Sequence, residues 1–135
     1  NELGTALTNT ACDLARHRKV FMLRPTPEMP VNVPTTSIRR IMLGVEPNIK
    51  ISKREYMKRN SWVWAAQDKA KNQCGVIIID STSELCSKGV CNSLKNGIPV
   101  YRDSNHLTEY GSQLLNPSLK IISEHITPRH EGAQR

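Results

Sequence analysis

The chain has 135 residues, of which 38% are apolar, and it carries a formal net charge of +7 at pH 7. This length fits one domain with a modest core. The sequence contains no run of eighteen apolar residues, and residues 1–15 lack the pattern of a signal peptide. Because the chain opens directly on a segment with helical spacing, we expect it to be part of a longer polypeptide.

The positive charge is concentrated in the first 60 residues, which hold 11 Lys or Arg against 5 Asp or Glu, whereas residues 61–135 hold 8 against 7. A basic face of this kind is compatible with simple solvation, with nucleic acid, with anionic lipid or with an acidic glycan. Aromatic residues make up only 4% of the chain, so a stacking platform for bases is not expected. We therefore predict no nucleic-acid partner. Most of the excess comes from Arg39, Arg40, Lys50, Lys53, Arg54, Lys58 and Arg59.

The first half of the chain predicts a helix, a strand and a stiff loop. Apolar and small residues recur at helical spacing over residues 2–17. The short apolar run Val20–Leu23 is typical of a strand buried on both faces. Four prolines between residues 25 and 34 then predict an extended, non-helical loop.

The middle of the chain repeats the order of helix and strand. Ser52 and Glu55 have the spacing of a capping box, which predicts one long helix over residues 53–72. Val76–Ile79 then predicts a second buried strand, which ends at Asp80. Helix followed by strand, twice over, indicates an α/β fold with a parallel sheet.

Toward the C-terminus, Val100 and Tyr101 predict a short extended piece, and a helix is expected from Thr108 to about Leu115. Asn116 and Pro117 stop that helix and begin another, and residues 127–135 are expected to form a frayed tail. Two strands are too few for a covered parallel sheet. We therefore expect one or more N-terminal βα units to lie before Asn1 or to come from another chain.

Four cysteines occur, and Cys86 and Cys91 lie within the turn-like stretch ELCSKGVCNSLKNG. This pair favours a local disulfide, which would place the domain in an oxidising compartment. Free thiols are the second possibility. A zinc site is the least favoured, because four ligands are needed and no matching pair stands nearby. The sequence does not decide whether Cys12 and Cys74 are bonded.

The stretch YRDSNHLTEYGSQLL places Asp103 three residues before His106. A carboxylate can hydrogen-bond one ring nitrogen of a histidine while the other nitrogen faces a nucleophile. The simpler alternative is that Asp103 caps a turn and His106 is an ordinary surface residue. The spacing alone does not distinguish the two.

This stretch resembles the last sequence block of the SGNH hydrolases, in which Asp-x-x-His is followed by Leu and then Ser or Thr. The longer segment from Ser81 to Leu115, with its Leu-Cys, short turn and second Cys, is similar to the SGNH domain fused to membrane acyltransferases that O-acetylate bacterial surface polysaccharides. KVFMLRPTPEMPVNVP is similar to the strand and Pro-Glu-Pro-Val loop of that family. The resemblance covers roughly residues 3–125.

The resemblance implies that residues 1–126 are the C-terminal part of a single three-layer, flavodoxin-like SGNH domain with a parallel sheet flanked by helices. It implies that Asp103 orients the imidazole and that His106 acts as general base and then as general acid. Cys86 and Cys91 would form a periplasmic disulfide, in a periplasmic domain of an inner-membrane protein. No cofactor and no metal are implied.

The implied reaction transfers an acetyl group through an acyl-serine to a sugar hydroxyl of an envelope polysaccharide such as lipopolysaccharide, with the acyl group delivered by an upstream membrane acyltransferase domain. The sequence departs from the family pattern because it contains no Gly-Asp-Ser block and no Gly or Asn block for the oxyanion. Ser81 in IIIDSTS is a poor substitute, since Ile79 stands where Gly is needed. The nucleophile is therefore expected from outside this chain, which alone should be inactive.

Two alternative functions stay open. An acetyl esterase would use the same residues with water in place of the sugar hydroxyl. A non-catalytic module would use the basic face at residues 39–59 to hold an acidic glycan or the membrane surface. Weaker site candidates are a cleft-lining Glu28, a sugar-steering Arg102, a structural His17, and solvent-facing His125 and His130.

Overall fold

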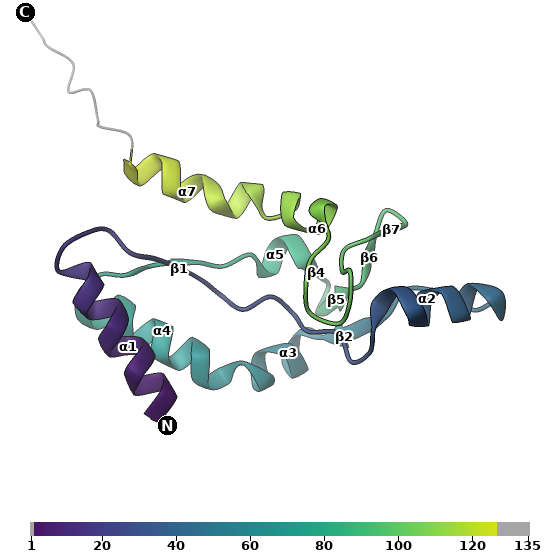
Figure 1. The fold of residues 1–135 in the computed structure, drawn as a ribbon, viewed down its shortest axis with the longest axis horizontal. Coiled ribbons are helices and arrows are strands. Elements are labelled where there is room, and N and C mark those ends of the chain that lie inside the picture. Colours follow the sequence, from purple (N-terminus) through teal and green to yellow (C-terminus); the bar gives the residue numbers. More distant parts are fainter. Residues whose placement is uncertain (1, 127–135) are drawn as a thin grey trace, which may run out of the picture.

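A computed structural model describes residues 2–126 of the chain, so the predicted tail at residues 127–135 lies outside the described residues. The chain contains helices and short strands (Figure 1). The elements are α1 (Glu2–Ala15), β1 (Phe21–Leu23), α2 (Val33–Met42), β2 (Lys50–Ser52), α3 (Lys53–Arg59), α4 (Ser61–Cys74), β3 (Ile77–Ile79), α5 (Thr82–Leu85), β4 (Cys86–Ser87), β5 (Val90–Asn92), β6 (Leu94–Lys95), β7 (Ile98–Pro99), α6 (Glu109–Gln113) and α7 (Asn116–Ile126).

The two strands predicted from apolar runs, β1 and β3, pair in parallel, with Phe21 opposite Ile77 and Leu23 opposite Ile79. Both α4 and α7 contact β3, and they lie on opposite sides of the strand pair (Figure 1). This arrangement agrees with the predicted α/β class. Within residues 2–126 the parallel sheet has these two strands only, and the other sheets are small and antiparallel.

The helix pair α1 and α4 forms one end of the molecule. Small side chains allow the close approach, since Ala11 and Ala70 are buried together with Val76. The Thr8 hydroxyl donates to the Ala66 carbonyl of α4 over 3.1 Å. The helices are also linked covalently, because Cys12 and Cys74 form a disulfide.

The single helix predicted over residues 53–72 is two helices, α3 and α4, which meet at Asn60. The predicted cap is confirmed, because the Ser52 hydroxyl accepts from the Glu55 N–H over 3.1 Å. The helix ends seven residues later, where the Asn60 side-chain amide donates to the Tyr56 carbonyl over 3.0 Å and the Asn60 backbone is no longer helical. A side-chain amide that competes for helix carbonyls in this way interrupts a helix that periodicity would continue.

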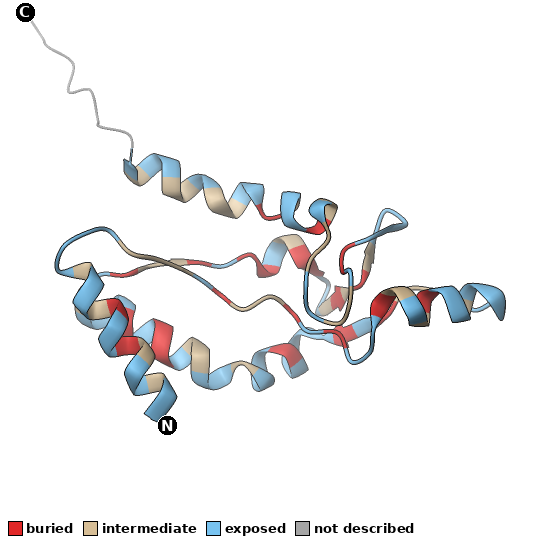
Figure 2. Cartoon of the chain, in the orientation of Figure 1, coloured by how far each residue is buried: buried red, intermediate tan, exposed pale blue. Residues whose placement is uncertain are grey.

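A second sheet is antiparallel, in the order β2–β5–β4, and joins β2 to the hairpin that follows α5. Cys86 pairs with Cys91 in its ladder, and the two are bonded as a disulfide, which confirms the favoured prediction over free thiols or zinc. Cys91 is fully buried and lies opposite Ile51 of β2. Figure 2 shows buried segments around this sheet as well as on α1 and α4. The larger core consists of Met29, Val33, Ile49, Ile51, Tyr56, Leu85, Cys86, Cys91, Val100, Tyr101 and Leu115.

Helix α2 begins at the end of the proline-rich loop. The sequence analysis did not predict this helix. Asn32 caps its first turn by accepting from the Thr35 N–H over 3.1 Å. Pro34 lies in the first turn, where a missing N–H costs no helical hydrogen bond. The fourth proline of the proline-rich segment, Pro34, therefore lies at the start of a helix, whereas the proline run predicted an extended, non-helical loop.

The two disulfides fit an extracytoplasmic location, because disulfides form and persist in oxidising compartments. Among residues 2–126, no helix has both the length and the apolar character needed to cross a bilayer.

The Cys12–Cys74 disulfide closes a loop of 62 residues, and the chain-entropy argument assigns about 4 kcal/mol to a loop of that size. Cys12→Ala/Cys74→Ala should lower the free energy of unfolding in urea by roughly this amount. The matched control, Asp13→Ala/Gln73→Ala, alters the neighbouring exposed positions of the same helices and should change it by less than about 0.5 kcal/mol. Equal effects of the two double variants would contradict the prediction.

Candidate active site

The candidate site lies on a short loop that closes at its base. Tyr101 and Leu107 form an isolated antiparallel bridge, and the Arg102 N–H donates to the His106 carbonyl over 2.9 Å. One residue further out on each side, the Thr108 N–H donates to the Val100 carbonyl over 2.9 Å. Asp103 and His106 therefore stand at the ends of the loop tip, facing each other.

The Asp103 carboxylate uses its two oxygens for two different tasks. Oδ1 accepts from the backbone N–H of His106 over 2.7 Å and from that of Asn105 over 2.8 Å. Oδ2 lies 2.7 Å from Nδ1 of the His106 ring. The backbone N–H of His106 and then that of Asn105 are the main causes that lower the pKa of Asp103 from 3.8 to about 2. The carboxyl group is thus ionised throughout the neutral range.

An ionised carboxylate accepts hydrogen bonds and donates none. The proton between Oδ2 and the ring therefore belongs to Nδ1 of His106, and the neutral ring keeps a free electron pair on Nε2. The His106 side chain is 60% exposed, whereas that of Asp103 is 34% exposed. The basic nitrogen is consequently held in one orientation and faces away from its carboxylate, toward the surface.

The loop is fastened to the proline-rich segment after β1. The Met29 N–H donates to the Ser104 carbonyl over 2.7 Å, and the Val33 N–H, at the start of α2, donates to the Asp103 carbonyl over 3.1 Å. Met29 and Val33 are themselves buried in the larger core. The segment that resembles the family's Pro-Glu-Pro-Val loop thus supports the Asp–His loop from one side.

Helix α6 supports the loop base from the other side. Thr108 caps this helix by accepting from the Gly111 N–H over 3.0 Å. Gly111 is packed so closely against Val100 that a Cβ atom at this position would overlap with the Val100 carbonyl oxygen. This carbonyl is the one that accepts from Thr108, so any shift there reaches the loop that carries His106.

Within the described residues, no hydroxyl group hydrogen-bonds to Nε2 of His106. Ser81 is buried, at the residue before α5, and is not brought to the imidazole. The ring thus has its orienting carboxylate but no visible nucleophile. The predicted roles of Asp103 and His106 stay predictions, although their contact is seen directly.

Of the other candidates, Arg102 is exposed in the loop itself, where its N–H donates to the His106 carbonyl, and Glu28 is exposed next to Met29, which bonds to the loop. His17 is exposed just after α1, away from the loop. His125 was expected to face solvent, but it is half-buried: its ring hydrogen-bonds to the Ile121 carbonyl over 2.8 Å and meets the edge of Phe21. The expectation was wrong because β1 passes directly beside α7. His130 lies outside the described residues.

The sequence analysis missed Arg24, which follows β1 and is buried. Its guanidinium donates to the Trp64 carbonyl over 3.0 Å and to Gln67 over 3.1 Å, and it forms an ion pair with Asp68. It also lies 4.6 Å from the centre of the Trp64 ring, a cation–π contact. These partners belong to α4, so Arg24 fastens the sheet to the helix. Only its position directly after an apolar run could have singled it out.

Two buried tyrosines near the site can be excluded as bases. Desolvation raises the pKa of Tyr101 well above its ordinary value, and it also raises the pKa of Tyr56. Both phenols therefore stay protonated at neutral pH.

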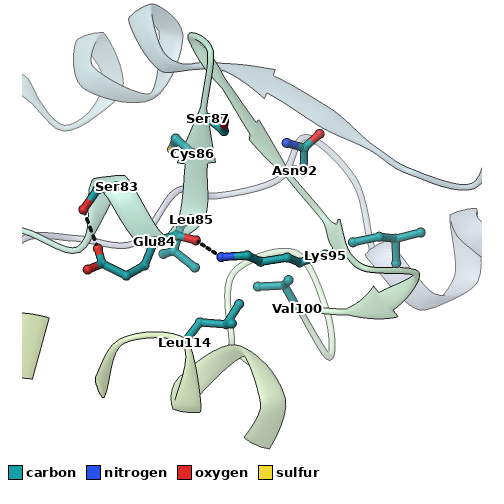
Figure 3. Close-up of a pocket in the computed structure, with 10 residues that line it drawn as sticks. Ser83, Glu84, Leu85, Cys86, Ser87, Asn92, Lys95, Val100 and Leu114 are labelled. Carbon is teal, nitrogen blue, oxygen red and sulfur yellow. Dashed lines mark hydrogen bonds between the residues drawn. The ribbon is translucent and has the colours of Figure 1, made fainter. Parts of the chain in front are cut away.

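A small apolar cavity lies beside the Cys86–Cys91 disulfide (Figure 3). Its volume is about 110 Å³, and Leu85, Val100 and Leu114 line it. Lys95 spans the opening and donates to the Glu84 carbonyl over 3.0 Å. Neither Asp103 nor His106 contributes to the lining. The cavity is well below the 300 Å³ or more of a typical small-molecule site, so it is not a substrate pocket.

Titration of Asp103 tests the origin of its low pKa. The side-chain carboxyl, followed by carbon NMR, should titrate near pH 2, so that its stabilisation of the loop is complete above pH 3.8 and is lost as the pH falls through about 2. In His106→Ala the pKa should stay well below 3.8, because the two backbone N–H donors persist. A return to 3.8 in that variant would show that the imidazole is the main cause.

Gly111→Ala should destabilise the domain by about 1–3 kcal/mol, because the added methyl group forces α6 away from the Val100 carbonyl. Ser112→Ala, at the exposed neighbouring position, is the control and should change the free energy of unfolding by less than about 0.5 kcal/mol. Thermal or urea unfolding measures both. A neutral Gly111→Ala variant would mean that α6 is free to shift.

Comparison with known proteins identifies the family to which the chain belongs. Residues 1–120 match the family model described as "SGNH domain (fused to AT3 domains)". No curated protein and no solved structure matches the chain. Fusion to AT3 domains connects these domains to acyl transfer and makes an acyltransferase domain their partner. The match spans most of the chain and includes the loop with Asp103 and His106, and the chain belongs to the SGNH domain family that is fused to AT3 domains.

Proposed function

We propose that this chain supplies the Asp–His half of an O-acyltransferase site, which moves an acetyl group to a sugar hydroxyl of a cell-envelope polysaccharide. The observation that carries the proposal is the 2.7 Å contact between Asp103 Oδ2 and His106 Nδ1, in a ring that is 60% exposed. A histidine oriented in this way has its basic Nε2 free for a hydroxyl group. Residues 1–126 then form the C-terminal part of one SGNH-type domain.

In the first half of the proposed reaction, a serine from outside this chain attacks the carbonyl carbon of the acyl donor. Nε2 of His106 takes the serine proton as the new C–O bond forms, and the imidazolium is stabilised by the ionised Asp103. The tetrahedral intermediate collapses, and the leaving group departs with the proton from Nε2. The donors that stabilise the oxyanion also come from outside this chain.

In the second half, the sugar hydroxyl occupies the position of the leaving group. Nε2 accepts the proton of this hydroxyl as its oxygen attacks the acyl-serine, and it returns the proton to the serine oxygen when the ester breaks. The acetyl group ends on the sugar, and the serine and His106 are restored. No step requires a metal or a redox partner.

An acetyl esterase differs only in the acceptor, because water would then attack the acyl-serine. The Asp103–His106 geometry serves both reactions equally, whereas fusion to an acyltransferase domain favours transfer. The periplasm is the proposed location, supported by the two disulfides. Measuring sugar-bound acetate and free acetate in the same assay separates the two reactions.

The test uses the intact protein that carries this domain, its AT3 partner and the missing serine. His106→Ala should lower acetyl transfer to the polysaccharide by at least about a hundredfold, since the general base is lost. Asp103→Asn should also lower it, by up to about 10⁴-fold. The substituted amide oxygen can still accept from the backbone N–H groups, but its NH₂ faces Nδ1 and forces the ring proton to Nε2.

The matched controls are His17→Ala and Asp13→Asn, which remove an exposed histidine and an exposed aspartate far from the loop and should leave transfer unchanged. Circular dichroism and melting temperature confirm that each variant folds. Unchanged transfer in folded His106→Ala would remove this residue from the mechanism. In that case a non-catalytic, glycan-binding module becomes the better account of the chain.

A further inference from the structure

The outer end of α2 carries a group of exposed apolar side chains, which we call the α2 patch. It consists of residues from the last two turns of the helix and the turn that follows it. The exposed fraction is 80% for Met42 and 77% for Leu43, the highest among the large apolar residues of the described chain. Figure 2 shows this end of α2 as exposed. The members of the patch are Ile38, Ile41, Met42, Leu43 and Val45.

The helix is apolar on the side that faces away from the protein. Val33 and Ser37 are buried against the core, whereas Ile38 and Met42, four residues apart, form a stripe on the outer side. Ile41 follows Ser37 by four residues and is exposed because this end of the helix extends past the core (Figure 1). Figure 1 shows α2 extending beyond the other elements. No described element covers this stripe.

The patch has a fixed shape and is not a frayed helix end. Gly44 adopts a positive φ of 68°, and the Val45 N–H donates back to the Arg40 carbonyl over 2.8 Å. The Arg40 guanidinium donates to the carbonyls of Glu46 and Asn48, over 3.1 and 3.2 Å. Leu43 and Val45 are therefore held in place on a closed turn beside Met42.

Basic side chains lie next to the patch and farther back toward the core. Arg39 is exposed on the last turns of α2, next to the patch. Lys50, Lys53 and Arg54 are also exposed, but they belong to β2 and α3, which lie near the inner end of α2 (Figure 1). The acidic residue that follows the patch, Glu46, accepts from the Asn48 N–H over 3.0 Å through its carboxylate. Exposed apolar side chains next to an arginine, on a chain of net charge +7, match a surface that is negatively charged outside and apolar beneath.

We propose that the α2 patch inserts into the surface of an anionic lipid bilayer. An acidic glycan would satisfy Arg39 and the lysines but would leave Met42 and Leu43 in water. A second copy of this chain would bring two molecules of charge +7 together, which opposes self-association. A bilayer accepts both features, because the apolar residues enter the acyl region while Arg39 stays among the phosphate groups.

Bilayer binding would also set the height of the Asp–His loop. The first residue of α2 donates its N–H to the Asp103 carbonyl, and the last residues carry the patch. The ten residues of α2 span roughly 15 Å at 1.5 Å per residue. The loop with His106 would thus be held about one helix length from the membrane surface, whatever reaction takes place there.

The experiment is cosedimentation of the complete SGNH-type domain, in which this chain is joined to the remainder of its domain, with vesicles of pure phosphatidylcholine and of phosphatidylcholine mixed with phosphatidylglycerol. Binding is expected to the mixed vesicles only. Met42→Ser/Leu43→Ser should lower the partition coefficient by at least about tenfold, and Arg39→Gln by roughly fivefold. Both variants alter exposed side chains and should keep the wild-type melting temperature. The matched controls are Leu14→Ser/Ile126→Ser and Lys71→Gln, which should bind as the wild type does.

Absence of binding to the mixed vesicles would overturn the proposal, as would equal loss in the α2 and control variants. Arg39-dependent binding to soluble polygalacturonate that is indifferent to Met42→Ser/Leu43→Ser, without vesicle binding, would assign the surface to an acidic glycan. A dimer in analytical ultracentrifugation that dissociates on Met42→Ser/Leu43→Ser would assign it to self-association. Each of these results contradicts insertion into lipid.

Discussion

The site depends on a single carboxylate that bonds to backbone and ring at once. Oδ1 of Asp103 closes the loop by accepting from two successive N–H groups, and Oδ2 fixes the ring of His106. The same negative charge that shapes the loop therefore decides which ring nitrogen carries the proton. Loop conformation and tautomer are coupled: a loop that opens also loses the orientation of its base. The anchors at Met29 and Val33 on one side and Gly111 on the other serve to keep this loop closed.

The parts of the fold that could be predicted from the sequence are those determined by short stretches of neighbouring residues. The apolar runs of β1 and β3, the Ser52 cap and the Cys86–Cys91 pair are each encoded in a few adjacent residues. What it missed depends on long-range contacts or on competition between local signals. The strands β2, β4 and β5 are only two or three residues long, too short for alternation to show. Asn60 interrupts a helix through one side-chain hydrogen bond, which periodicity does not reveal.

For the candidate site, too, the local contacts could be predicted from the sequence and the long-range contacts could not. Asp103 and His106 are three residues apart, so their contact is local, and the loop chemistry could be anticipated from the spacing. The supports of the loop could not, because Val33 is 70 positions away and makes its bond through the backbone. Arg24 was missed for a related reason: its partners lie on α4, more than forty residues later. A lone basic residue after a strand gives no sign of whether its charge will be buried.

The connectivity of the two disulfides has a bearing on how the domain matures. Four cysteines allow three pairings, and the structure contains the one in which each cysteine bonds to the next along the chain, Cys12 to Cys74 and Cys86 to Cys91. When a polypeptide enters an oxidising compartment with its N-terminus first, its cysteines become available for oxidation in this same order. Consecutive oxidation of these four cysteines would produce the pairing seen in the structure.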